Sequence, residues 1–255
     1  MKSVYRDSYQ YLRPSIEDAI TRFNQIGKSL HDGRNVVKVI DVEGESLNFK
    51  RFKKPNTINK IVYKFFRKSK AQRSFEYATV LKEKGIGTPD PVAYLEEESL
   101  FNFGISFYIS KQLNCDFTYR ELINDDSIED KEQILKEFTR FIYHMHEAGV
   151  YFLDNSPGNT LITKVGDHYE FALVDLNRMK FYNIPWDDRL KNFERLSPHK
   201  WMYEVMGGLE YATLSRKRPE ETIAQMWKYT QDFQEAFHRK KRLKNKFKSI
   251  FKGNK

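Results

Sequence analysis

Regular hydrophobic spacing is clearest between residues 128 and 147, where apolar side chains recur at intervals of three and four. This spacing places them on one face of an α-helix, and the residues concerned are Ile134, Leu135, Phe138, Phe141, Ile142 and Met145. Gly149 follows the last of them, and glycine commonly stands just beyond the end of a helix. The pattern therefore predicts an amphipathic helix from about Ile128 to Glu147.

Short runs rich in β-branched and aromatic residues before this helix are typical of β-strands. Four strands are expected, at residues 35–42, 47–52, 92–95 and 103–110. A turn at residues 43–46 separates the first two, whereas the spacing from Thr57 to Lys84 is helical, in two pieces with the second starting near Lys70. The first thirty residues carry a weaker pattern and are expected to be irregular or to form a short helix.

The pattern after the central helix combines one small hairpin with further helices. Strands are expected at residues 160–163 and 171–174 around a turn at Gly166, and a last long helix begins near Pro219. Strands followed mainly by helices predict an α+β fold of two lobes. The expected boundaries are residues 1–112 for an N-terminal lobe, 113–238 for a helical C-terminal lobe and 239–255 for a tail.

Charge is distributed unevenly along the 255 residues. The chain has 44 Lys and Arg against 35 Asp and Glu, a net charge of +9, and residues 239–255 contain nine basic residues and no acidic one. The apolar residues of this tail fall on one helical face; they are Leu243, Phe247, Ile250 and Phe251. Such a helix can lie in a membrane interface, and a solvated terminus and a nucleic-acid-binding segment are the alternatives. We favour the membrane surface as the partner, and expect no nucleic acid.

The sequence excludes several other classes of site. Cys115 is the single cysteine, so neither an intrachain disulfide nor a cysteine-based zinc site is expected. The phosphate-binding motifs GxxxxGK[ST] and GxGxxG are missing, as is the metal-binding motif HExxH. The first residues lack the apolar run of a secretory signal, and no stretch of about 18 apolar residues occurs. We therefore expect a cytoplasmic protein that can sit on a membrane surface.

The most informative residues are two carboxylates and an amide around the expected hairpin. Asp154 follows the central helix, Asn159 comes five residues later, and Asp175 follows an apolar strand sixteen residues after Asn159. Phosphoryl transfer needs a carboxylate to accept the proton of the attacking hydroxyl, and hard oxygen ligands to hold Mg²⁺ against the phosphates. The alternative is that both aspartates are turn or capping residues, but the combination favours Mg²⁺-dependent phosphoryl transfer.

These residues resemble the catalytic loop and the magnesium loop of the protein-kinase-like superfamily. More narrowly, residues 154–161 (DNSPGNTL) and 173–179 (LVDLNRM) are similar to the lipopolysaccharide kinase (Kdo/WaaP) family, as are residues 49–52, 67–76 and 87–91. The resemblance extends from about Gly33 to Phe181. It implies a bilobal protein-kinase-like fold, with a small β-rich N-terminal lobe and a mainly helical C-terminal lobe.

The resemblance also implies roles for individual residues. Asp154 would be the catalytic base, and Asn159 and Asp175 would bind Mg²⁺. Lys50 would contact the α- and β-phosphates of ATP, and Glu76 would hold Lys50 in an ion pair.

Some assignments leave alternatives open, and two features depart from the kinase pattern. Glu83 is a second candidate for the ion-pairing glutamate, while Lys53 points to the opposite strand face from the proposed lysine. Phe152 stands where kinases usually have a histidine, two residues before the catalytic aspartate. A multi-glycine phosphate loop is missing, so Gly33, in residues 31–35, is the candidate for contacting the phosphates of ATP.

The resemblance further implies a substrate class. It implies transfer of the γ-phosphate of ATP to Kdo or heptose of the lipopolysaccharide inner core, with a lipid A precursor presented at the cytoplasmic face of the inner membrane. The alternatives are a kinase of another small molecule or of a protein, and a non-catalytic pseudokinase scaffold. Basic residues that could meet anionic groups of the acceptor, or form a solvated surface, are Lys60, Lys64, Arg67, Lys68, Lys70, Arg73 and Arg178.

Overall fold

The computed structural model describes residues 1–33, 35–53, 68–97 and 104–252, with side chains as far as residue 245. Lys60, Lys64 and Arg67, together with the first of the two expected helical pieces, lie outside the described residues. The chain forms two compact units. The first comprises residues 1–115 and 172–179, and the second comprises residues 116–171 and 180–255.

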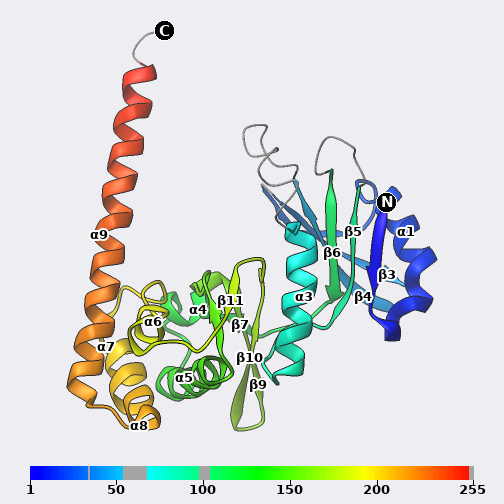
Figure 1. Cartoon of the computed structure of the whole chain (residues 1–255). Helices are drawn as coiled ribbons and strands as arrows, with labels where there is room; N and C mark the ends of the chain where they lie inside the picture. The colour runs from blue at the N-terminus through cyan, green and yellow to red at the C-terminus, as the bar shows by residue number, and fades with distance from the viewer. Residues whose placement is uncertain (34, 54–67, 98–103, 253–255) are drawn as a thin grey trace. The chain divides into compact units, whose positions relative to one another are not determined.

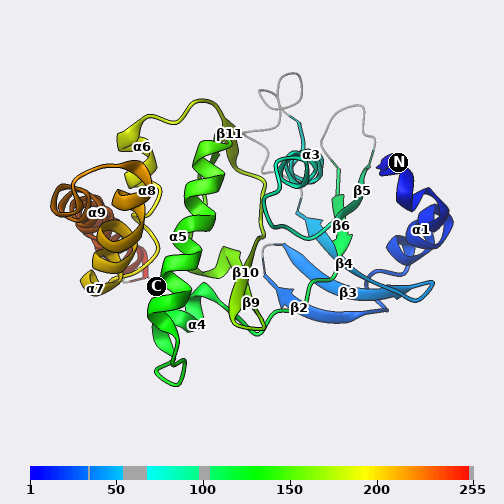
Figure 2. The same ribbon diagram turned by 90° about the horizontal axis from the view of Figure 1, so that it is seen from below.

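The first unit is built on a six-stranded sheet in the order β1-β5-β6-β4-β3-β2 (Figure 1). All its neighbouring strands run antiparallel. The strands are β1 (Lys2–Tyr5), β2 (Lys28–Asp32), β3 (Val36–Val42), β4 (Glu45–Phe52), β5 (Pro91–Glu96) and β6 (Ser106–Lys111). The adjacent strands β2, β3 and β4 are seen side by side in Figure 2.

Helices cover the two faces of this sheet (Figure 1). Helix α1 (Arg13–Thr21) contributes Ile16 to a buried cluster with Leu47 and Phe49 of β4. Helix α3 (Lys70–Glu83) lies against the other face, where the ring of Phe75 contacts that of Tyr94. Because side chains alternate along a strand, Lys50 lies on the α3 side, opposite to Leu47 and Phe49.

The strands and helix expected in the N-terminal half are confirmed, but the first thirty residues are more regular than the sequence indicated. They hold β1, the 3-10 helix η1 (Asp7–Leu12), α1 and the start of β2. Every residue of β2 is exposed, so this strand has no alternation of buried and exposed positions that a sequence pattern could reveal. The expectation of an irregular lead-in was therefore wrong for the two strands.

The second unit is mainly helical and is organised around α5 (Lys131–Glu147), which lies between the hairpin of residues 160–173 and the helices of residues 186–252 (Figures 1 and 2). The ring of Phe138 in α5 contacts the rings of Tyr119 and Phe171 at centroid distances of 4.7 and 5.5 Å. The predicted amphipathic helix is confirmed, and it ends where expected. The strands are β7 (Phe117–Thr118), β8 (Val150–Phe152), β9 (Thr160–Val165), β10 (His168–Leu173) and β11 (Met179–Phe181).

Short helices lie on both sides of the β9–β10 hairpin in the sequence, and a long helix follows them. They are α4 (Tyr119–Asn124), η3 (Pro157–Asn159), α6 (Trp186–Lys191), α7 (Lys200–Tyr203), the π-helical segment η4 (Glu204–Tyr211) and α8 (Ala212–Ser215). The final helix, α9 (Pro219–Lys252), packs closely on η4: a Cβ atom at Gly208 would lie 2.7 Å from Cδ1 of Ile223. The expected basic tail is continuous with this helix as far as Lys252.

Gly149 joins α5 to β8 and provides a test of this connection. Its φ is +73°. A Cβ atom added at this position would lie 3.1 Å from the carbonyl oxygen of Tyr182. We expect Gly149→Ala to lower the free energy of unfolding by about 1–2 kcal/mol from the backbone conformation alone, with a further loss from the contact. Urea unfolding followed by circular dichroism measures this change.

Gly166→Ala is the matched control, because Gly166 has a φ of +59° but no atom within 4 Å of its Cβ position. Equal destabilisation in the two variants would show that the close approach to Tyr182 does not constrain the connection.

Candidate active site

In the first unit, β4 and the segment after β10 bring Lys50 and Asp175 together. Lys50 Nζ donates to Asp175 Oδ1 at 2.5 Å, and the two side chains are 16% and 38% exposed. Asn177 Nδ2 donates to the same oxygen at 2.7 Å. Asp175 also has a φ of +60°, a conformation that aspartate tolerates better than most residues. A lysine and a carboxylate of the kind that binds Mg²⁺ are thus in direct contact.

A loop before β5 fixes the segment that carries Asp175. Leu173 N donates to Gly87 O at 2.9 Å, and the hydroxyl of buried Thr88 donates to Leu173 O at 2.8 Å. Residues 87–91, which the family resemblance singled out, therefore have a structural role two residues from Asp175.

The expected ion pair between Lys50 and Glu76 is not formed. Lys68 Nζ binds both oxygens of Glu76 at 2.9 and 2.8 Å, and Gln72 Nε2 donates to one of them at 2.9 Å. Lys68 stands just before α3 and Gln72 lies one turn before Glu76, so local neighbours occupy this carboxylate while Lys50 binds Asp175. The expected pairing was wrong for this structure, and the roles of Lys50 and Glu76 stay predictions.

Gly33 lies in the turn between β2 and β3. Its N–H donates to Asn35 O at 3.4 Å, and a Cβ atom there would lie 2.5 Å from Nε2 of His31. The turn joins two antiparallel strands, and its proposed contact with phosphates stays a prediction.

In the second unit, the loop after β8 brings Asp154 and Asn159 together. Asn159 Nδ2 donates to the backbone carbonyl of Asp154 at 2.9 Å, and Asn159 N donates to Ser156 O at 2.9 Å. Because the amide nitrogen is used by the loop, the amide oxygen is the Asn159 atom suited to a metal ion. Arg195, which the sequence did not indicate, forms an ion pair with Asp154 at 3.4 Å.

Asn192, just after α6, forms hydrogen bonds with residues that precede and follow Asp154 in the sequence. Its Nδ2 donates to the carbonyl of Phe152 at 2.8 Å, and its own backbone carbonyl accepts from Asn155 Nδ2 at 3.0 Å. Phe152 is fully buried and Asn155 is 1% exposed. The loop therefore has fixed bonds on each side of Asp154, although Phe152 replaces the usual histidine.

His146 of α5 extends this network and is buried at 1% exposure. Asn192 Oδ1 lies 3.1 Å from His146 Nε2, and the Tyr211 hydroxyl lies 2.7 Å from His146 Nδ1. Since Oδ1 can only accept a hydrogen bond, Nε2 carries the hydrogen, and Nδ1 accepts a hydrogen bond from the Tyr211 hydroxyl. Burial, with a smaller contribution from the positive charge of Arg189, lowers the pKa of His146 from 6.5 to about 3. The imidazole is therefore neutral, and it joins Asn192 to Tyr211 in the interior of the second unit.

Residues of the network that the sequence missed come from separate segments. Asn192, Arg195 and Tyr211 follow Asp154 by 38 to 57 residues and match no short motif. One cue existed: His146 is a polar residue on the apolar side of α5, and a buried polar residue requires partners.

The protein supplies only some of the ligands that a magnesium ion would need. No group of three or more His, Cys, Asp or Glu that could hold a metal occurs among the described residues. Mg²⁺, however, commonly takes one or two carboxylates and completes its shell with waters and phosphate oxygens. Asp175 in the first unit and Asn159 in the second unit each carry an oxygen of this kind, and their role as magnesium ligands stays a prediction.

The neutrality of His146 predicts a pH dependence of stability. The unfolded chain binds a proton near pH 6.5, whereas the folded chain does so only near pH 3. Stability is therefore lost as the pH falls below about 6.5, by up to about 1.4 kcal/mol per pH unit. Urea unfolding between pH 7 and 4.5 should show a shallower dependence for His146→Gln than for wild type. His168→Gln, at an exposed position of β10, should retain the wild-type slope, and equal slopes in all three proteins would contradict the assignment.

Comparison with known proteins places these features in a family. No curated protein matches the chain. A solved structure titled WaaP in complex with acyl carrier protein is similar, with a TM-score of 0.61 and 16% sequence identity over 92% of this chain and 99% of that chain. This similarity confirms the α+β fold, with a sheet in the N-terminal part and helices in the C-terminal part.

The profile of the lipopolysaccharide kinase (Kdo/WaaP) family matches residues 32–205. This range includes the loop of Asp154, the segment of Asp175 and strand β4 with Lys50. Members of the family are phosphotransferases that act on sugars of the lipopolysaccharide core. Because the match covers more than half of the sequence, the chain belongs to the lipopolysaccharide kinase (Kdo/WaaP) family.

Proposed function

We propose that the chain transfers the γ-phosphate of ATP to a hydroxyl of Kdo or heptose in the lipopolysaccharide inner core. The observation that carries this proposal is the loop of Asp154, which is fixed on both sides and lies within the family match. A pseudokinase scaffold would not need a carboxylate held in this way. A kinase of another small molecule or of a protein is the remaining alternative.

Asp154 is the proposed base. Its carboxylate orients the sugar hydroxyl and accepts its proton, while the hydroxyl oxygen forms a bond to the γ-phosphorus and the bond to the leaving oxygen of ADP breaks. Asn159 bonds to the backbone of Asp154, so a ligand held by its amide oxygen would be kept next to the base.

Lys50, Asp175 and Asn159 are proposed to bind the phosphates of ATP and Mg²⁺. Lys50 now neutralises Asp175, and its ammonium group can turn to a phosphate oxygen once the carboxylate faces a cation. Asp175 and Asn159 would hold Mg²⁺, which when bound withdraws negative charge from the phosphates. Gly33, in the β2–β3 turn, is proposed to contact the phosphates of ATP. Glu76 is proposed to restrain α3 through Lys68 and Gln72.

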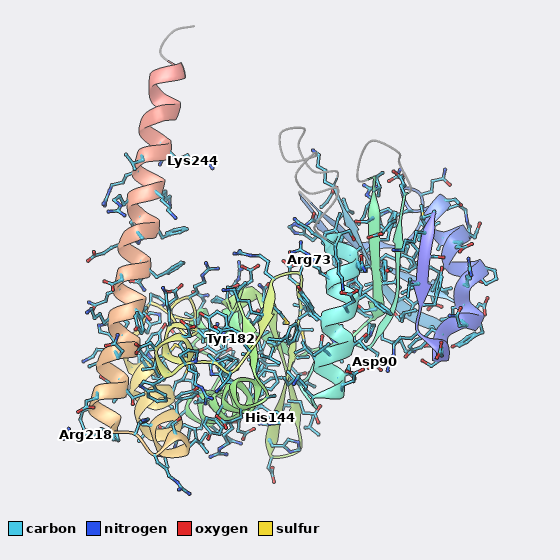
Figure 3. All side chains as sticks on the ribbon, in the orientation of Figure 1. Arg73, Asp90, His144, Tyr182, Arg218 and Lys244 are labelled. Atoms are coloured by element: carbon cyan, nitrogen blue, oxygen red, sulfur yellow. The ribbon has the colours of Figure 1, made fainter. Side chains whose placement is uncertain are left out.

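The far end of α9 is proposed to rest on an anionic membrane surface, where a lipid-linked acceptor would be found. Arg218 immediately precedes α9, and Lys244 lies toward the far end of the helix (Figure 3). Two exposed apolar side chains, Phe237 at 54% and Leu243 at 50%, lie there on either side of the exposed basic residues 239–242. No helix among the described residues is long and apolar enough to cross a membrane. An amphipathic basic helix binds through headgroup charge and shallow insertion.

Transfer of labelled phosphate from ATP to a Kdo-containing lipid A precursor tests the catalytic proposal. We expect wild type to label the glycolipid, and Asp154→Asn to lower kcat by about 100- to 10,000-fold because the general base is lost. Binding of MgATP, measured by calorimetry, should change little. Asp126→Asn is the control, since Asp126 is fully exposed.

Label on a protein or a soluble metabolite in place of the glycolipid would favour the alternative kinases. Tight binding of MgATP without any transfer would favour the pseudokinase.

Sedimentation with lipid vesicles tests the role of α9. The variant replaces five exposed basic residues by glutamine: Arg239, Lys240, Lys241, Arg242 and Lys244. We expect its affinity for anionic vesicles to fall at least about 100-fold, because each basic residue near an anionic surface contributes about 1 kcal/mol. The matched control removes five exposed lysines elsewhere in the sequence: Lys2, Lys28, Lys180, Lys191 and Lys200. Equal loss in both variants, or equal binding of wild type to neutral vesicles, would contradict the role of α9.

A further inference from the structure

Arg195 stands beside the proposed base and also contacts the terminal helix. Its Nη1 lies 3.4 Å from Asp154 Oδ1, and its Nε lies 3.8 Å from Glu194 Oε1. On the other side, its guanidinium carbon lies 5.2 Å from the ring centre of Phe233 in α9. Arg195 therefore bridges the loop of Asp154 and α9.

The position of Arg195 is fixed from two directions. The segment that carries it is held by the buried hydroxyl of Tyr203, which accepts from Ser197 N at 3.1 Å and lies 3.2 Å from Phe193 O. The guanidinium lies over the ring of Phe233, which itself stacks on Phe237 with 25° between the rings. An arginine restrained by such contacts loses less freedom when it binds a ligand.

Arg195 is not needed to hold the loop of Asp154 in place. Asn192 already holds the residues on both sides of Asp154. The Arg195 ion pair is long, at 3.4 Å, and the arginine side chain is one-third exposed (33%); ion pairs in contact with water contribute only about 0–1 kcal/mol. Guanidinium has five N–H donors in a planar fork, and Asp154 receives one of them.

We propose that Arg195 binds an oxyanion of the acceptor sugar, a carboxylate or a phosphate, and thereby presents the neighbouring hydroxyl to Asp154. This inference rests on the proposed function and names the residue that selects its acceptor. A planar fork binds such groups through two parallel hydrogen bonds. Because one guanidinium contacts both Asp154 and α9, the charged part of the acceptor would bind between the base and the helix that we propose to face the lipid.

The experiment pairs changes in the residue with changes in the acceptor. Initial rates of wild type and Arg195→Gln are compared on the intact glycolipid, on the same glycolipid with its carboxylates methylated, and on its dephosphorylated form. We expect Arg195→Gln to lower kcat/KM about 100-fold on the intact acceptor, because one partner of a charge pair is removed. On the acceptor that lacks the recognised oxyanion, wild type should be slowed equally, and the substitution should then change the rate less than about threefold. If the methylated acceptor gives this result, Arg195 binds a carboxylate; if the dephosphorylated acceptor does, Arg195 binds a phosphate.

Two further variants separate recognition from a general disturbance. Arg195→Lys keeps the charge without the fork, and should restore part of the lost kcat/KM on the intact acceptor. Arg218→Gln removes an exposed arginine with a side chain 79% exposed, and should leave the choice among acceptors unchanged. A large loss on all three acceptors with Arg195→Gln, or no loss on any, would overturn the inference.

Calorimetric binding of the same acceptors needs no turnover and separates this inference from the proposed activity. If the intact acceptor binds wild type about 100-fold more tightly than Arg195→Gln but no phosphate is transferred, the proposed activity fails and the role of Arg195 stands. If phosphate is transferred but Arg195→Gln weakens the binding of all three acceptors by the same factor, the inference fails and the activity stands. If the acceptor does not bind wild type, both are overturned.

Discussion

The hydrogen bonds of Asn192 are the constraint on which the candidate base depends. A buried polar side chain is costly unless it is bonded, and Asn192, only 5% exposed, is bonded through its amide nitrogen, amide oxygen and backbone carbonyl. Its partners are the residues on both sides of Asp154 and the neutral imidazole of His146. The backbone at Asp154 therefore cannot shift without breaking these buried hydrogen bonds.

A comparable arrangement holds the other charged groups in the first unit. Asp175 leaves β10 in a left-handed conformation, next to a segment that Gly87 and Thr88 bind through hydrogen bonds. Lys50 reaches it from the sheet face shared with α3. Each unit thus carries part of the proposed chemistry on a backbone fixed by its own contacts, which is the preorganisation that electrostatic catalysis requires.

Local patterns in the sequence were sufficient for α5, for the β9–β10 hairpin and for the identity of the family, because these depend on neighbouring residues. They failed for β2, whose residues are all exposed, and for the pairing of Glu76, where Lys68 is a closer partner than Lys50. Asn192 and Arg195 were beyond reach for a different reason. Their partners lie about 40 residues away, and only the folded chain brings them together.

The most direct test of the account is a crystal structure of the protein with Mg²⁺ and an unreactive ATP analogue. We expect one bound nucleotide, with Lys50 on its phosphates and no longer on Asp175, and with Asp175 and Asn159 as ligands of the metal. Asp154 should remain bonded through its loop to Asn192, with its carboxylate directed toward the γ-phosphate. A nucleotide bound elsewhere, or a metal ion without Asp175 and Asn159 among its ligands, would contradict the account.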